Sequence, residues 1–290
     1  MPDFGKIAND AKLRVEKARA SNGFVDIVVR TFKRFSEDDG GFYAAALTYY
    51  VFFSIFPILI FATAVLGFVT DVYPEIEADL LRESFESFPL INTIIDADVL
   101  ASVQRAAGKL ALLSIVLALY SGTGAVVALG HALNKIHRVE NEGNFFEKRL
   151  AAVKWLALFS VAVLGSLTVT SVGAWAPEAV ATLIGFVAGI ALNLGIFLTA
   201  FKFLPHFKRS WSDVLPGALI AGGVFELLKW FGTIYLDRGA ATRSATFGAF
   251  ATAAGLLVAS YLLAQITLLA AEVNAVLAER RLTRQSLTTG

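Results

Sequence analysis

The sequence contains no cysteine and few charged residues. Without cysteine, thiol nucleophiles, iron–sulfur clusters, cysteine-based zinc sites and a disulfide-rich scaffold are excluded. Charged residues make up 17% of the 290 residues, below the roughly 25% that soluble domains average. Hydrophobic residues reach 56%, and the mean hydropathy is +0.65. This composition excludes a disordered chain and indicates a membrane protein.

Six apolar segments are long enough to cross a bilayer as helices. A hydrocarbon core about 30 Å thick requires roughly 20 residues at about 1.5 Å per residue. None of the segments alternates with a period of two, so helices are favoured over barrel strands. The expected fold is an all-α, polytopic membrane protein with six transmembrane helices in one bundle. The spans are expected at residues 43–70, 110–130, 153–176, 179–201, 214–236 and 246–275.

Positive charge is distributed unevenly between the segments that connect these spans. With six spans, nineteen Lys and Arg side chains lie on one side of the membrane and five on the other. Because an excess of Lys and Arg marks the cytoplasmic side, both termini are expected in the cytoplasm. A cleavable signal peptide is not expected, because fifteen of the first 41 residues are charged.

The regions outside the six spans have patterns of their own. Residues 1–41 are expected to form a cytoplasmic amphipathic arm, which either lies among anionic lipid headgroups or packs against the ends of the spans. Residues 71–108 are expected to form a short helical external cap, and residues 277–290 a basic cytoplasmic tail. Residues 42–276 then form one membrane domain. In the arm, apolar residues recur at helical spacing among basic ones: Phe24, Val28, Phe32 and Phe35.

Polar side chains inside the expected spans are the best indication of function. An ionisable residue at the bilayer centre costs about 2.5–3.5 kcal/mol and usually faces a bundle interior or a wet cavity. Glu226 and Lys229 lie three residues apart, so they form either an internal ion pair or a polar lining that contacts a headgroup, an ion or a proton. Pro57 is a candidate hinge. The candidates for a substrate or ion path are Glu226, Lys229, Gln265, Glu272, Asn274, Tyr50, Tyr120 and His131.

Motifs for catalysis or metal binding do not occur in the sequence. The three histidines form no H-E-x-x-H site, and no Walker loop or G-x-S-x-G elbow is present. Glu37-Asp38-Asp39 is a group of acids in a turn-like stretch, and a solvated cluster is favoured there over a cation site. We therefore expect no catalytic residue, no metal, no cofactor and no enzymatic activity.

Several short motifs, in their order and spacing, resemble those of a known family. The sequence resembles the YihY/BrkB family of bacterial inner-membrane proteins, formerly labelled ribonuclease BN-like, over roughly residues 30–280. The resemblance implies a six-helix protein of the bacterial cytoplasmic membrane with both termini inside. The chain departs from the family pattern at Phe247, Ser260 and Ala271, where tyrosine, tryptophan and glycine are common. The matching motifs are AAALTYY at residues 44–50, SIFP at 54–57, Tyr120-Ser121, ALNKI at 132–136, Pro205 with Trp211, PGA at 216–218, Glu226 with Lys229 and Tyr235, Phe247-Gly248 and AEVN at 271–274.

These observations lead to three functional hypotheses. The first is a transporter-like protein that moves, or helps to move, a lipid or amphipathic solute across the cytoplasmic membrane. The alternative is a membrane scaffold for an envelope-assembly complex. A weaker alternative is a membrane-bound hydrolase or nuclease, as in the old family label. Membrane lipids and envelope-assembly proteins are the expected partners, nucleic acid is not expected, and homo-oligomerisation is left open.

Overall fold

The computed structural model describes residues 19–54, 122–140, 143–173, 177–243 and 248–289, together with residues 13, 16, 17, 116 and 120. Within these residues the chain is helical and contains no strand, which confirms the expected all-α class. Residues 40–54 and 122–136 are helical. The labelled helices are α2 (Gly23–Glu37), α7 (Phe145–Gly173), α8 (Glu178–Phe203), α9 (Trp211–Arg243) and α10 (Gly248–Thr289).

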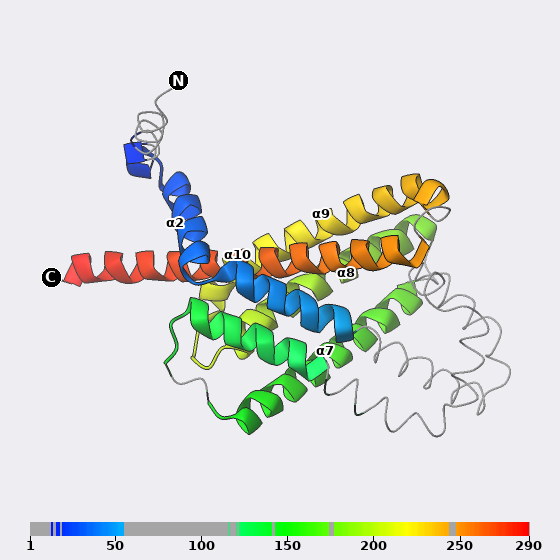
Figure 1. The fold of residues 1–290 in the computed structure, drawn as a ribbon, viewed down its shortest axis with the longest axis horizontal. Helices are drawn as coiled ribbons and strands as arrows, with labels where there is room; N and C mark the ends of the chain where they lie inside the picture. The colour runs from blue at the N-terminus through cyan, green and yellow to red at the C-terminus, as the bar shows by residue number, and fades with distance from the viewer. Residues whose placement is uncertain are drawn as a thin grey trace.

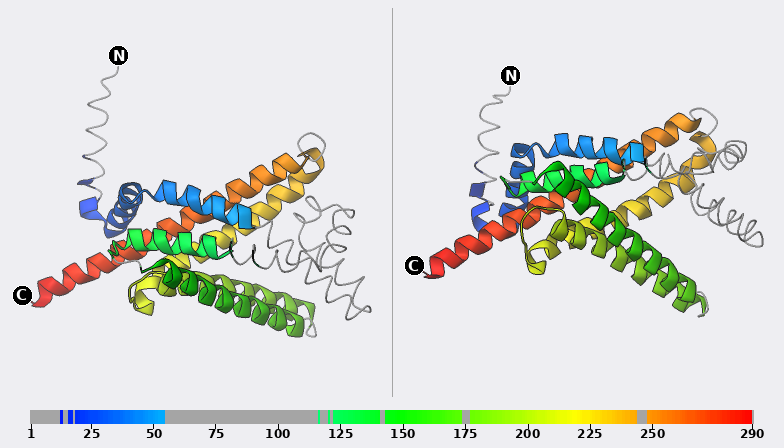
Figure 2. Two further views of the ribbon diagram at one scale, coloured as in Figure 1. Left: turned by 60° about the horizontal axis from the view of Figure 1, so that its bottom comes forward. Right: turned by 90° about the horizontal axis from the view of Figure 1, so that it is seen from below.

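The long helices lie side by side in an elongated bundle (Figure 1). α9 packs along α10, α7 packs along α8, and α8 also contacts α9. The helical residues 40–54 and 122–136 lie along the same bundle (Figure 2). α2 contacts α10 and crosses it, and α10 continues beyond the crossing to the C-terminus (Figure 1).

Small side chains allow the helices to approach closely. Ala44, Ala218, Ala221 and Ala270 are all fully buried, although they come from three different helical segments. Inside a bilayer the hydrophobic effect does not drive helices together, so packing of small residues contributes much of the attraction. The core is formed by residues from α7, α8, α9 and α10 together with the helical residues 40–54 and 122–136.

Three helices of the described residues have the length and apolar composition needed to cross a membrane. They are Ala179–Phe203, Trp211–Lys229 and Ala253–Leu287, which correspond to the expected fourth, fifth and sixth spans. On the first of these, Leu183 and Phe186 are about 60% exposed, as is typical of a face that contacts lipid. Much of the first and second expected spans lies outside the described residues, so the bundle of six spans stays a prediction.

The last helix is longer than the sequence analysis predicted. The sixth span was expected to end at Ala275, followed by a separate basic tail, but α10 continues to Thr289. Residues 276–289 contain neither glycine nor proline, so nothing in this sequence ends the helix. The extension also makes contacts, because Glu279 and Arg280 bond to side chains of α2.

Candidate functional site

A cavity of about 790 Å³ lies between residues 40–54, residues 120–131 and the first turn of α7. It brings together three residues that the sequence analysis singled out, Tyr50, Tyr120 and His131. Tyr43, Tyr49, Phe53 and Phe145 add further aromatic surface, and Lys148 and Arg149 add positive charge.

The beginning of α7 places the two cations at this cavity. The backbone N of Asn144 donates to Glu147 Oε2 and the backbone N of Glu147 donates to Asn144 Oδ1, both at 2.9 Å. This reciprocal pair is a capping box, which fixes where a helix begins. Lys148 and Arg149 are therefore the fourth and fifth residues of α7, where they line the cavity.

The Arg149 side chain is held in place by residues of the neighbouring helix. Its Nη1 donates to Thr123 Oγ1 at 2.7 Å and to the carbonyl O of Tyr120 at 3.2 Å. Its guanidinium lies 4.6 Å from the Tyr120 ring centroid and 5.6 Å from that of Phe145, in cation–π geometry. A guanidinium has five N–H donors, and the two described bonds both use Nη1. Among the described residues no bond is made by Nε or Nη2, so these donors can serve a ligand.

The described lining of the cavity contains no carboxylate. The acid closest to the two cations in sequence, Glu147, instead caps its own helix. His131 also lines the cavity, and its ring is edge-on to that of Tyr43 at 5.7 Å. A site with cations, tyrosine hydroxyls and aromatic walls can hold a molecule with an anionic group and an apolar body.

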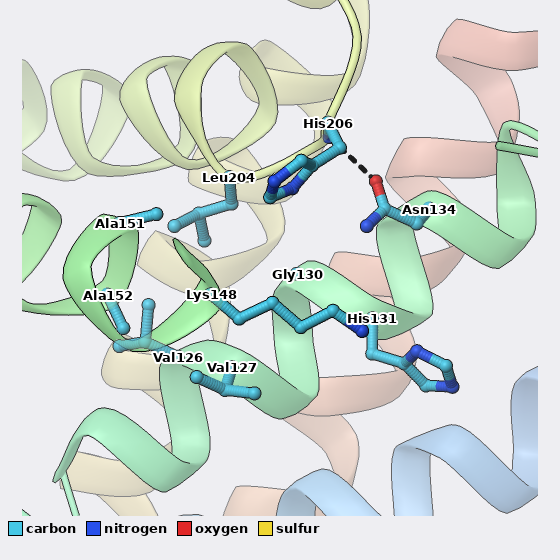
Figure 3. Close-up of a pocket in the computed structure, with 10 residues that line it drawn as sticks. All are labelled: Val126, Val127, Gly130, His131, Asn134, Lys148, Ala151, Ala152, Leu204 and His206. Atoms are coloured by element: carbon cyan, nitrogen blue, oxygen red, sulfur yellow. Dashed lines mark hydrogen bonds between the residues drawn. The ribbon is translucent and has the colours of Figure 1, made fainter. Parts of the chain in front are cut away.

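A smaller cavity of about 20 Å³ lies beside His131 (Figure 3). Its volume suffices for about one water molecule. The Lys148 side chain extends toward His131 there, and Asn134 Oδ1 accepts a hydrogen bond from the backbone N of His206 at 2.8 Å (Figure 3). Asn134 thereby joins residues 122–136 to the connection that follows α8.

Glu226 and Lys229 form an ion pair on α9, with 2.8 Å between Lys229 Nζ and Glu226 Oε2. Asn193 of α8 donates to the other carboxylate oxygen, Oε1. Both oxygens of Glu226 therefore have partners, which is the geometry of the ion-pair alternative. The sequence analysis did not name Asn193, although an amide inside an apolar span was a signal for an interhelical hydrogen bond.

Gln265 and Pro57 are two further candidates from the sequence analysis. Gln265 Nε2 donates at 2.7 Å to the hydroxyl of Tyr261, one turn earlier on the same helix. Pro57, the candidate hinge, lies outside the described residues, as does the expected external cap at residues 71–108.

Asn274 connects α10 to the first turns of α9. Its Oδ1 accepts from the backbone N of Gly217 at 2.7 Å, and its Nδ2 donates to the carbonyl O of Val214 at 3.3 Å. Pro216 interrupts the hydrogen bonding of α9 at this point because it has no N–H. The amide of Asn274 thus satisfies backbone groups beside the proline, and two of the family-like motifs meet here.

Glu272 is fully buried, and its partner comes from the N-terminal arm. Its Oε2 accepts from Arg34 Nε at 3.0 Å. Arg34 Nη2 also donates to the carbonyl O of Ile136 at 2.8 Å, and Nη1 donates to Glu279. Burial opposes the charge of Arg34, but the carboxylates of Glu279 and Glu272 raise the pKa of its guanidinium above the ordinary value.

Asp38 is a fourth member of this group, with its Oδ2 at 4.0 Å from Arg34 Nη2. It is only 8% exposed, so the interpretation of residues 37–39 as a solvated acidic cluster is wrong for Asp38. The sequence could not reveal this, because the cluster forms only where α2 crosses α10. Asp39 is exposed and has a φ of 56°, a left-handed conformation that aspartate tolerates better than most residues. It turns the chain from α2 into the helical residues 40–54.

α2 is oriented with its polar face inward. Asp26, Thr31 and Arg34 are buried, whereas Phe24 and Phe32 are 71% and 59% exposed. Asp26 accepts hydrogen bonds from Arg280 and from Arg19, the latter at 2.9 Å. The Arg280 hydrogen bond is the main reason that the pKa of Asp26 falls to about 2. The arm therefore packs against α10 through its polar face. Phe24 and Phe32 face away from the protein, whereas Phe35 is partly buried against the core.

The helical fold, the apolar spans and the clustered motifs define the class of the protein as a helical membrane protein. The chain belongs to the Virulence factor BrkB family, whose model matches residues 31–289, and this confirms the resemblance seen in the sequence.

Several relatives are named as membrane proteins. The chain is 25% identical to the inner membrane protein YhjD of Escherichia coli, over 84% of this chain and 78% of that protein. It is 30% identical to a UPF0761 membrane protein of Albidiferax ferrireducens, over 84% of this chain and 60% of that protein. It is 24% identical to YfkH of Bacillus subtilis, which is named as ribonuclease-like, over 86% of this chain and 94% of that protein. No solved structure matches the chain.

Proposed function

We propose that this membrane protein is transporter-like and moves, or helps to move, a lipid or amphipathic solute across the bacterial cytoplasmic membrane. The observation that supports the proposal is the aromatic and cationic cavity between residues 40–54, residues 120–131 and α7. Tyr50, Tyr120 and His131 are its proposed substrate contacts, together with Lys148 and Arg149.

The chemistry of the cavity favours a lipid with an anionic headgroup. Two cations without a carboxylate in the described lining attract a phosphate or carboxylate, and Arg149 offers it N–H donors of fixed orientation. The tyrosine and phenylalanine rings provide surface for the apolar part of the same molecule. Both requirements are met by one amphipathic anion.

Movement of lipid can be measured with the purified protein in liposomes that contain fluorescent phosphatidylglycerol. An impermeant quencher reports how fast the inner-leaflet lipid becomes accessible. Ala46→Phe places a ring in the cavity and is expected to slow this exchange to the protein-free rate. Ala191→Phe, on an exposed position of α8, is the matched control and is expected to leave it unchanged. Equal rates with and without wild-type protein, with insertion verified, would reject the proposal.

The role of the cationic residues of the cavity can be tested by measuring the affinity of the protein for phosphatidylglycerol. Arg149→Gln removes a charge-assisted contact, so phosphatidylglycerol is expected to bind roughly 10–100-fold more weakly. Lys154→Gln removes a cation from an exposed position of the same helix and is expected to have no effect. Equal losses in the two variants would show that only the general surface charge matters.

The remaining proposed positions on or beside the substrate path are Glu226, Lys229, Gln265, Glu272 and Asn274. Glu226→Gln discriminates between the two alternatives for its pair with Lys229. If the pair serves transport, the variant is expected to lose lipid movement at unchanged thermal stability. If it serves packing, the variant is expected to unfold at lower temperature in detergent and to retain movement per folded molecule.

A membrane scaffold for envelope assembly is the second candidate function. The observation that favours it is the extension of α10 beyond the bundle, where Leu282 and Leu287 are 66% and 78% exposed (Figure 1). The scaffold hypothesis expects that truncation after residue 279 abolishes co-purification of a partner. It also expects that neither the wild type nor any variant moves lipid in liposomes. A hydrolase or nuclease is the weaker alternative, and it expects an activity that depends on a divalent metal.

A further inference from the structure

Two buried carboxyl groups flank a single guanidinium where α2 crosses α10. Glu272 is 0% exposed and Asp38 and Arg34 are each 8% exposed. Asp38 is a side-chain neighbour of Glu272, and Arg34 contacts both carboxyl groups. Because the three residues come from two helices and the turn after α2, the group exists only when the arm is docked.

Each carboxyl group keeps one oxygen without a hydrogen bond. Among the described residues, Asp38 Oδ2 and Glu272 Oε1 are buried and have no hydrogen-bond donor. Arg34 does not supply one, since its described bonds go to Glu272 Oε2, to Glu279 and to the Ile136 carbonyl. A buried charged oxygen without a hydrogen-bond donor destabilises the folded protein, so a ligand that satisfies both oxygens is strongly favoured.

The charges identify that ligand. The buried part of the group has one guanidinium and two carboxyl groups, so a single additional positive charge makes it neutral. We propose that Asp38 and Glu272 hold one proton between them, which makes the crossing of α2 and α10 a proton-binding site. One shared proton donates from one carboxyl group to the unpaired oxygen of the other, which satisfies both at once.

Some of the charged groups that surround this site favour binding of the proton and others oppose it. Glu279 on α10 adds negative charge and is half exposed, whereas Arg34 on α2 attracts the ionised form of both acids. His137 and Arg209 are further titratable or charged groups near this site, and both interact electrostatically with Arg34. Binding of the proton removes a buried net negative charge, so it strengthens the docking of α2 on α10.

The test uses the full chain in liposomes and infrared difference spectra between about pH 8 and about pH 5, a range in which buried carboxyl groups titrate. The wild type is expected to show the C=O stretch of a protonated, buried carboxyl group. The band is expected to be absent in Asp38→Asn, where an amide N–H replaces the shared proton. Asp39→Asn, which changes the exposed neighbouring acid, is the matched control and is expected to keep the band.

Thermal unfolding provides a second readout. A folded state that binds an additional proton becomes more stable as the pH falls. The Tm of the wild type is therefore expected to rise relative to the Tm of Asp38→Asn as the pH is lowered. Glu272→Gln is expected to behave in the same way. If this variant does not fold, Asp38→Asn alone is sufficient to test the proposal. A band that survives in Asp38→Asn, or a wild-type spectrum without the band down to about pH 5, would overturn the proposal.

Discussion

At the scale of single residues, Arg34 joins three segments that are far apart in the sequence. Its Nε, Nη1 and Nη2 reach Glu272, Glu279 and the carbonyl O of Ile136, respectively. Only arginine offers this many donors in a fixed plane, so lysine cannot replace it without loss of contacts. The side chain therefore acts as an anchor between the arm, residues 122–136 and α10.

Removal of this anchor is expected to destabilise the protein strongly. Arg34→Ala leaves the buried Glu272 and Asp38 without their guanidinium and breaks a buried ion pair, which costs about 3–5 kcal/mol. Arg30→Ala, on the same helix, removes a half-exposed partner of Asp26 and is expected to cost only about 0.2–1 kcal/mol. Thermal unfolding in detergent compares the two, and equal losses would show that the Arg34 network contributes no more than a surface pair.

His137 is expected to make the stability of the protein depend on pH below 6.5. Burial, with the nearby positive charges of Arg209 and Arg34, lowers its pKa from 6.5 to about 3. The unfolded chain therefore binds the proton first, and the contribution of neutral His137 to stability is lost as the pH falls from 6.5 toward about 3. His137→Phe is expected to lose less stability over this range, as measured by Tm against pH. A steeper loss in the variant would contradict the assignment.

At the scale of elements, α2 is an amphipathic helix whose apolar face is left uncovered by the described part of the protein. Its buried face carries Asp26, Thr31 and Arg34, and its outer face carries Phe24 and Phe32. α2 crosses α10 instead of running along it (Figure 2), which suits a helix that lies in the plane of the membrane surface. The two alternatives for the arm, packing against the spans and lying among lipid headgroups, are therefore compatible. The polar face of α2 would serve the first and its apolar face the second.

A membrane location of this face can be tested by fluorescence, and the absence of cysteine makes single labelling sites simple to introduce. A polarity-sensitive dye at Phe24→Cys or Phe32→Cys is expected to shift to shorter wavelength in liposomes and to be quenched by lipid-borne quenchers. Glu37→Cys, which is exposed on the same helix, is the control and is expected to report water. Equal spectra at the three positions would place the apolar face outside the bilayer.

Close contact between α9 and α10 depends on Gly217. A Cβ at this position would overlap the Ala270 carbonyl and the Asn274 side chain, whereas a Cβ at Gly223 meets nothing. Gly217→Ala is therefore expected to lower the Tm, while Gly223→Ala is expected to be neutral or to stabilise the helix by about 0.5–1 kcal/mol. The two substitutions are chemically identical, so a similar response would show that the contact is unimportant.

At the scale of the whole molecule, the distribution of positive charge predicts which side of the membrane each segment occupies. Nineteen Lys and Arg side chains are expected on the cytoplasmic side and five on the other. A green fluorescent protein fused to the C-terminus is expected to fluoresce, because it folds only in the cytoplasm. Alkaline phosphatase inserted within residues 71–108 is expected to be active. An active phosphatase at the C-terminus would contradict the topology.

The sequence predicted those features of the site that lie within one helix, but not those that depend on how helices pack. The spacing of Glu226 and Lys229 correctly predicted that they could pair, because residues three apart on a helix are neighbours. Tyr50 was found as a polar position on the first expected span, and Tyr120 and His131 were found on one face of the second. Their common cavity depends on how these two segments pack. Arg149 and Lys148 were counted only as cations that indicate topology.

The membrane class of the protein, its all-helical fold and its family could be predicted from the sequence, because hydropathy, helical spacing and short motifs are local properties of the chain. The contacts between helices were needed to show that Asp38 and Arg34 are buried, that α2 turns its polar face inward, and that Asn274 satisfies the backbone beside Pro216. These features require contacts between residues far apart in the chain, and a helix alone does not determine which of its faces a distant segment will cover.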